Sequence, residues 1–146
     1  MKKVLFGILV VIILIQFIRP EKNISNIETN NITTVMEVPA DVKEIIKTSC
    51  ADCHSNTTVY PWYSEVAPVS WFLAQHVNEG KEHLNFSEWA AYNKDQKNHI
   101  LKDIKKELKK QGMPLESYLW IHNDAKMTEA QYETLLNWVN TIPSEY

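Results

Sequence analysis

Both cysteines of the 146-residue chain lie in one five-residue motif, Cys50-Ala51-Asp52-Cys53-His54. A C-x-x-C-H motif is typical of c-type haem attachment, and its spacing has a mechanical reason. Each thiol adds to one vinyl group of the porphyrin, and two intervening residues let both sulfurs lie along one edge of the ring. The adjacent His54 then lies under the iron as an axial ligand. The motif therefore predicts one covalently bound haem c, held by Cys50, Cys53 and His54.

Three other uses of a C-x-x-C pair remain open. In an oxidising compartment the two thiols can form a structural disulfide. A thioredoxin-like redox pair requires a strand before the motif and a βαβ context, and the sequence shows neither. A zinc site requires two more ligands at finger-like spacing, whereas the histidines of this chain are scattered. Haem attachment is the reading that the adjacent histidine favours.

Met113 is the predicted sixth ligand of the iron. It lies 59 residues after His54, between Gly112 and Pro114, where a helical pattern ends. A methionine in a loop can direct its thioether at the iron from the side opposite the histidine, and a thioether raises the reduction potential. The alternatives are an ordinary core or surface methionine and bis-histidine ligation by His76, which lies on an apolar helix face.

The first twenty residues read as a signal or anchor segment. Lys2 and Lys3 precede an apolar run, Val4–Ile18, that is interrupted by Gly7 and Gln16. Fifteen residues of helix span roughly 22 Å, which is short of the ~30 Å hydrocarbon core of a bilayer. No small-x-small cleavage pattern follows, so an uncleaved anchor is favoured over a cleaved signal peptide. The two lysines predict a cytoplasmic start, with the rest of the chain on the periplasmic or other extracytoplasmic side.

Residues 21–38 are polar and rich in asparagine and threonine, without a helical apolar stripe, which predicts a flexible linker. Residues 39–146 then read as one all-α domain, because apolar residues recur at helical spacing and nothing alternates with the period of a strand. Four helices are expected. The first begins at Pro39, and the second spans 69–84. The third spans 88–110, with Ser87 as its N-cap and Gly112 as its stop, and the fourth begins at a capping box formed by Thr128 and Gln131.

The charge distribution argues against nucleic acid as a partner. Outside residues 1–22, eleven lysines face seventeen aspartates and glutamates, a net charge of −6. Nucleic-acid binding needs a basic footprint. The lysine-rich run from Lys102 to Lys110 is ordinarily a solvated helix face, but it ends three residues before Met113. It is therefore a candidate docking patch for an acidic redox partner.

Three segments carry a family resemblance: CADCHSNTTVYPWYSEVAPVSWFLAQHVNEGKEHLNFSEW, GMPLESYLWIHNDAKMT and the final LLNWV. With them the chain resembles the small bacterial haem-binding domain family of monohaem proteins. The helix before the motif, the Met-Pro loop and the aromatic terminal helix also look like the class I cytochrome c fold. The resemblance covers roughly residues 40–140 and implies covalent haem with His54 as an axial ligand.

Two functions follow from a covalent haem in a small exported domain. The first is one-electron transfer by a six-coordinate iron, with an unidentified redox protein as partner and no enzymatic activity. The second is a ligand sensor or peroxidase-like enzyme with a displaceable sixth ligand. A peroxidase needs a distal acid/base group and is usually a larger chain or has a second haem. The single motif, the methionine candidate and the small domain favour electron transfer. For His54 itself, the carbonyls of Pro61 and Pro68 are candidate acceptors for the ring Nδ1.

Overall fold

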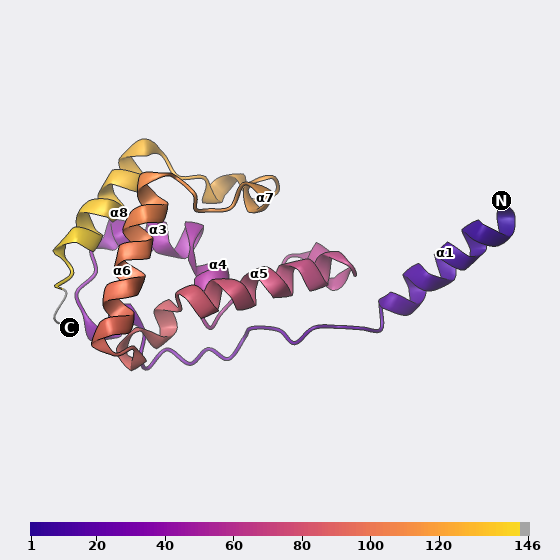
Figure 1. Cartoon of the computed structure of the whole chain (residues 1–146), viewed down its shortest axis with the longest axis horizontal. Coiled ribbons are helices and arrows are strands. Elements are labelled where there is room, and N and C mark those ends of the chain that lie inside the picture. Colours follow the sequence, from indigo (N-terminus) through magenta and orange to yellow (C-terminus); the bar gives the residue numbers. More distant parts are fainter. Residues whose placement is uncertain (144–146) are drawn as a thin grey trace.

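The regular structure of residues 1–143, which the computed structural model describes, is entirely helical (Figure 1). The prediction of an all-α chain is confirmed for these residues, with a single isolated bridge between Ile24 and Thr57 as the nearest approach to a strand. The α-helices are α1 (Lys2–Ile15), α2 (Ile32–Val35), α3 (Ala40–Ser49), α4 (Ala51–His54), α5 (Val69–His83), α6 (Lys94–Lys109), α7 (Glu116–Leu119) and α8 (Glu129–Thr141). The 3-10 helices are η1 (Trp62–Glu65), η2 (Phe86–Ala91) and η3 (Asn123–Ala125).

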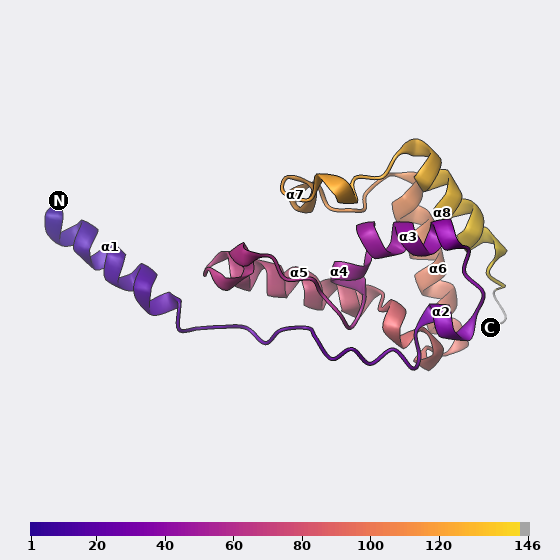
Figure 2. The same ribbon diagram turned by 180° about the vertical axis from the view of Figure 1, so that it is seen from behind.

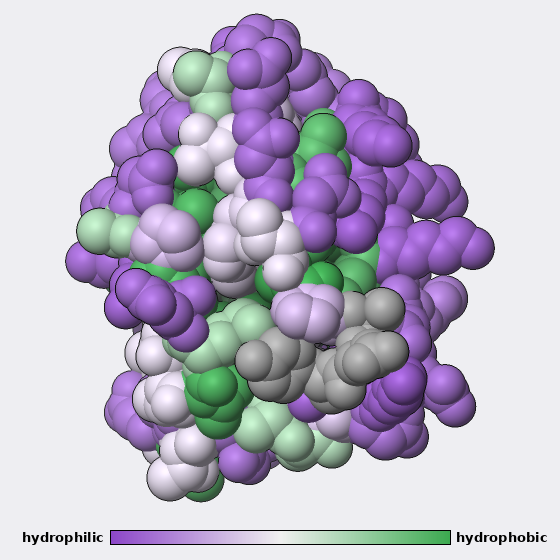
Figure 3. Space-filling model, turned by 90° about the vertical axis from the view of Figure 1, so that its left-hand side faces the viewer, coloured by the Kyte–Doolittle hydropathy of each residue, from purple (hydrophilic) through white to green (hydrophobic). Residues whose placement is uncertain are grey.

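The hydrophobic core lies where α3, α6 and α8 pack together, at the end of the molecule away from α1 (Figure 2). Each helix contributes an apolar stripe at three- and four-residue spacing, which is why the sequence pattern located it. The 3-10 helix η2 contributes Trp89 to this core, and the Trp89 side chain is almost fully buried. The outer surface at this end is largely hydrophilic (Figure 3). The buried stripes are Val42, Ile45 and Ile46 of α3, Ile100, Leu101 and Leu108 of α6, and Leu135, Trp138 and Val139 of α8.

The start of α6 differs from the prediction. Ser87 is not an N-cap: it is buried in η2, where its hydroxyl donates a hydrogen bond to Glu28. The helix begins at Lys94, after a capping box formed by Asn93 and Gln96. An asparagine three residues before a glutamine carries the same signal as the Thr128–Gln131 box, which is confirmed at the start of α8.

The end of α6 is also displaced by one residue from the predicted glycine stop. Gln111 adopts the left-handed conformation with φ of 53°. Its amide donates to Leu108 O, and the amide of Gly112 donates to Glu107 O. These two bonds form a Schellman motif in which the glycine is the second residue beyond the helix cap. The helix therefore ends before Met113, as predicted.

The apolar run at the N-terminus is helical as far as Ile15, so α1 has 14 residues. Gln16 is the C-cap of the helix, and its side chain hydrogen-bonds both the carbonyl of Ile12 and the backbone of Ala67. Within residues 1–143, the structure contains no helix that combines the length and apolar character needed to cross a membrane.

Residues 21–38 differ from the flexible linker predicted for them, because they lie along the domain and contribute to its core (Figure 1). Ile32 is 1% exposed and Val38 is 4% exposed. The amide of Ala90 donates to the carbonyl of Asn30, which ties the segment to η2. The sequence pattern missed this packing because isolated apolar residues in a polar segment form no periodic stripe.

The packing of Ile32 generates the first prediction. Replacing Ile32 with Ala should lower the free energy of unfolding by about 2–5 kcal/mol, because a buried isoleucine leaves a cavity. The matched control is Val35→Ala on the same short helix, where the side chain is 45% exposed and the expected change is within ~0.5 kcal/mol. Denaturant titration of both variants measures the difference. Equal small effects would show that residues 21–38 are loosely attached.

Candidate haem-attachment site

The two cysteines lie on a single helical turn that follows a bend in the chain. Cys50 ends α3 with φ of −130° and ψ of −38°, and α4 starts at the next residue. The carbonyl of Cys50 accepts the amides of Cys53 and His54 at 3.2 and 3.0 Å. Residues three apart on a helical turn lie on one side of it, so both thiols and the histidine belong to one compact unit.

Both thiols are free and partly buried. Burial, with a smaller contribution from Cys53, raises the pKa of Cys50 to about 12. Burial, with a smaller contribution from Asp52, raises the pKa of Cys53 to about 11. A thioredoxin-like pair requires a lowered thiol pKa, so these directions disfavour that alternative. Among residues 1–143 no cluster of three or more histidine, cysteine or acidic side chains is placed to hold a metal ion.

His54 is oriented by the C-terminal end of α5. Its Nδ1 lies 2.8 Å from the carbonyl oxygen of Gly80 and 3.0 Å from that of Leu84. Carbonyls only accept, so Nδ1 carries the proton and Nε2 keeps its lone pair. Burial lowers the pKa of His54, and the two carbonyls oppose that shift. A neutral imidazole with a fixed tautomer is the form in which histidine binds a metal.

The acceptors for His54 are therefore not Pro61 or Pro68, the carbonyls considered from the sequence. Those prolines lie before α5, whereas the histidine packs against the last turn of that helix. The Gly80 carbonyl also accepts the amide of Leu84 at 2.9 Å, so His54 uses its second lone pair, whereas Leu84 is the C-cap residue, whose carbonyl lies beyond the helix. Helix α5 instead brings the carbonyls of Gly80 and Leu84, 26 and 30 residues after His54, to the ring.

Gly80 is a site residue that the sequence analysis missed. A Cβ built on Gly80 would lie 2.6 Å from the carbonyl oxygen of Cys53, a distance that no real side chain tolerates. The glycine thus lets the backbones of α5 and α4 touch at the haem motif. The signal that could have found it is a glycine inside an otherwise regular helical pattern, which costs stability unless packing requires it.

Asp52, between the two cysteines, ties the motif to two other segments. Its carboxylate accepts the Val59 amide at 3.0 Å and the Tyr118 hydroxyl at 2.7 Å. Tyr118 stacks on the ring of His122, with centroids 4.1 Å apart, and that ring is hydrogen-bonded to the Tyr63 hydroxyl. We call residues 113–127, the segment between α6 and α8 that carries α7, the arm. The arm is therefore attached both to the C-x-x-C-H motif and to η1.

Met113 lies at the base of this arm and is partly buried. Its carbonyl accepts the hydroxyl of Tyr132 at 3.0 Å. Tyr132 packs with Cys50 against the core, and burial raises its pKa, with smaller contributions from Glu129 and Cys50. The carbonyl of Met113 is therefore held by a side chain of α8. Its thioether as an iron ligand stays a prediction.

The other histidine candidate, His76, lies in the middle of α5. Its ring meets the ring of Phe72 edge-on at a centroid distance of 4.1 Å. Phe72 is largely exposed. Ligation by His76 also stays a prediction.

The residues present fit a covalent haem. Two free thiols share one helical turn, and the neighbouring imidazole is neutral, with its Nδ1 engaged by carbonyls. Among residues 1–143 the structure gives Nε2 of His54 no hydrogen-bond partner. These are the donor types and the tautomer that thioether attachment and axial ligation require.

The contact at Gly80 generates the second prediction. Alanine is favoured over glycine in a helix by about 1 kcal/mol, but the Cβ at Gly80 would push α5 away from Cys53. Gly80→Ala should therefore destabilise the protein by about 1–3 kcal/mol and reduce the yield of haem-loaded protein. The exposed Asn78 on the same helix supplies the control, Asn78→Ala. Unchanged stability and haem content in Gly80→Ala would show that the close contact is dispensable.

The family comparison agrees with this site. A family described as "Haem-binding domain" matches residues 10–141, which include the end of α1, the segment before α3 and the whole helical domain. Comparisons with curated proteins and with solved structures give no match. The chain therefore belongs to the haem-binding domain family.

Proposed function

We propose that this chain is a membrane-held electron carrier with one haem c, attached through Cys50 and Cys53 and ligated by His54. The observation that carries the proposal is the position of His54 Nδ1 between the carbonyls of Gly80 and Leu84. It supports a proximal ligand that is held in one tautomer before the cofactor arrives. Haem, when bound, supplies an iron that accepts and releases one electron.

Covalent attachment requires little of the chain beyond geometry. Each S–H bond adds across one vinyl double bond, so nothing leaves and two thioethers form. The high pKa values of Cys50 and Cys53 keep the thiols protonated and poorly nucleophilic in the unloaded protein.

The arrangement of the helices supports a class I cytochrome c-like interpretation. Helix α3 leads directly into the haem motif and packs against the terminal helix α8. The arm after α6 starts at Met113, and Tyr118 attaches this arm to Asp52. Tyr132 and Tyr118 thus fix the arm at two points, which supports a saturated iron with a methionine ligand over an open ligand-binding site.

The redox partner is proposed to be an acidic protein that docks on α6. Lys102, Lys105, Lys106 and Lys109 line a shallow surface hollow of about 640 Å³ with Leu101 and Ile142 at its apolar side. A positive patch on an otherwise acidic domain attracts and orients an acidic partner. The patch ends close to Met113 along the chain.

The location outside the cytoplasmic membrane rests on the N-terminal segment. Lys2 and Lys3 begin α1, and the apolar side chains that follow them in this helix are exposed as far as Leu14. Exposed apolar surface of this extent needs a nonpolar environment. A bilayer, with the lysines on the cytoplasmic side, supplies it.

The third prediction tests attachment. Haem should remain with the polypeptide after denaturation and acid-solvent extraction of protein matured in a host that makes c-type cytochromes. Cys50→Ala with Cys53→Ala should lose it, because no thioether can then form. Intact-protein mass spectrometry measures the bound cofactor. Haem that extracts freely from the unmutated protein would refute the covalent proposal while leaving haem binding intact.

The fourth prediction concerns the sixth ligand. Met113→Ala should open the distal position, lower the reduction potential and let carbon monoxide bind the ferrous protein readily, because the soft Fe–S bond is lost. Met36→Ala is the control, since Met36 is only partly buried whereas Met127 lies in the core. His76→Ala tests bis-histidine ligation. Rapid carbon monoxide binding by the unmutated protein would contradict the saturated iron and favour the sensor or peroxidase-like alternative.

A further inference from the structure

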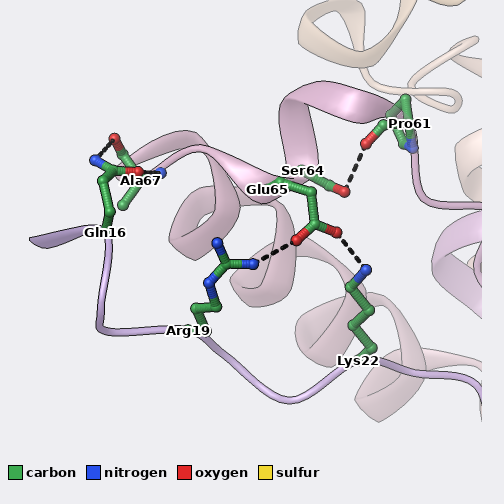
Figure 4. Close-up of polar contacts among 7 residues, drawn as sticks. All are labelled: Gln16, Arg19, Lys22, Pro61, Ser64, Glu65 and Ala67. Atoms are coloured by element: carbon green, nitrogen blue, oxygen red, sulfur yellow. Dashed lines mark hydrogen bonds and ion pairs between the residues drawn. The ribbon is translucent and has the colours of Figure 1, made fainter.

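The chain that follows α1 is fastened to the haem domain. We call residues 16–23 the neck. The side chain of Gln16 donates to the carbonyl of Ala67 at 3.1 Å and accepts its amide at 2.9 Å, as a strand partner would (Figure 4). The indole of Trp71 donates to the carbonyl of Ile18 at 2.7 Å. Asn23 hydrogen-bonds Ser55, Thr58 and Lys81 further along. The neck is therefore attached at both of its ends.

Glu65 adds charge to this attachment without dominating it. Its carboxylate binds Arg19 at 2.7 Å and also contacts Lys22 (Figure 4). The hydrogen bond and charge of Lys22, followed by the charge of Arg19, lower the pKa of Glu65. All three side chains are exposed, and exposed ion pairs contribute little to stability. The hydrogen bonds of Gln16 and Asn23 therefore define the position and orientation of the neck on the domain.

The end of the domain that holds the neck also carries a cluster of exposed apolar side chains. Trp62 is 81% exposed and Trp120 is 75% exposed. The segments that hold them are joined, because Tyr63, next to Trp62, contacts His122, which follows Trp120 by two residues. All five residues of what we call the apolar tip are exposed hydrophobic side chains: Trp62, Val66, Val69, Trp120 and Ile121.

The segments that carry the apolar tip lie at the end of the domain nearer α1 (Figures 1 and 2). In Figures 1 and 2, the start of α5 and the arm with α7 both extend from the core toward the side where α1 lies. Val66 immediately precedes Ala67, the residue that Gln16 binds, and Val69 follows it by two residues. The point where the apolar helix ends is therefore the point where the apolar tip begins.

The length of α1 provides a reason for this arrangement. A helix of 14 residues spans about 21 Å, whereas the hydrocarbon core of a bilayer is ~30 Å thick. A short apolar segment is accommodated by thinning the bilayer or by drawing its flanking residues inward. Because the neck is fastened, drawing Phe17 and Ile18 inward brings the apolar tip to the lipid surface. Tryptophan is the residue most typical of that interface.

We propose that the apolar tip is a membrane-docking surface: it rests in the lipid interface, and the neck fixes its orientation there. The inference rests on the proposed anchoring through α1. Its consequence is that the haem site has a fixed depth and orientation, because Tyr118, two residues before Trp120, is bonded to Asp52 of the haem motif. A flexible tether would leave the same site free to face any direction.

The test places the full-length haem-loaded protein in phospholipid nanodiscs, with and without nitroxide-labelled lipid headgroups. The relaxation of the tryptophan indole N–H signals is compared between the two samples in the reduced state. Trp62 and Trp120 should relax several-fold faster with the label, and Trp89 and Trp138, buried in the core, should change little. Combining Gln16→Ala with Asn23→Ala should reduce the effect at the apolar tip without releasing the protein from the disc.

Two results would overturn the proposal, and they are distinguishable. If the protein enters the disc but Trp62 and Trp120 behave like Trp138, the tip is free of lipid, and anchoring through α1 stands. If the protein does not associate with the disc at all, the proposed anchoring fails, and the docking surface fails with it. Haem attachment is untouched by either result, since it is measured separately.

Discussion

The contact between α4 and the last turn of α5 is the constraint on which the rest of the site depends. It places the carbonyl of Cys53 against the backbone of Gly80 and brings two carbonyls to Nδ1 of His54. A single glycine makes this approach possible. One contact therefore positions the backbone of the motif and holds the imidazole of His54 with its proton on Nδ1.

Other segments are then attached to the same turn. Asp52 binds Tyr118 of the arm, and Tyr132 fixes Met113 from the core side. The neck reaches the turn through Asn23, which binds the carbonyl of Ser55, the residue after His54. The short motif is thus the meeting point of the core, the arm and the N-terminal segment. This explains how so small a domain can define the surroundings of a large cofactor.

Much of the helical framework could be predicted from local signals. Helices α3, α5 and α8 carry apolar stripes, and α8 also begins with a capping box; each of these signals involves residues only a few positions apart in the sequence. The motif of Cys50, Cys53 and His54 is equally local. Contacts between distant segments could not be read in this way. The acceptors of His54, the requirement for Gly80, the burial of Ser87 and the packing of Ile32 each depend on which segments the fold brings together. None of them leaves a periodic pattern in the sequence.

The central claim is that His54 binds the haem iron through Nε2 while the end of α5 holds its Nδ1. A crystal structure of the haem-loaded protein tests it most directly. The account predicts thioether bonds from Cys50 and Cys53, iron bonded to His54 Nε2, and Nδ1 within hydrogen-bond distance of the carbonyls of Gly80 and Leu84. Iron bound through a different residue, or a His54 ring turned away from α5, would contradict it.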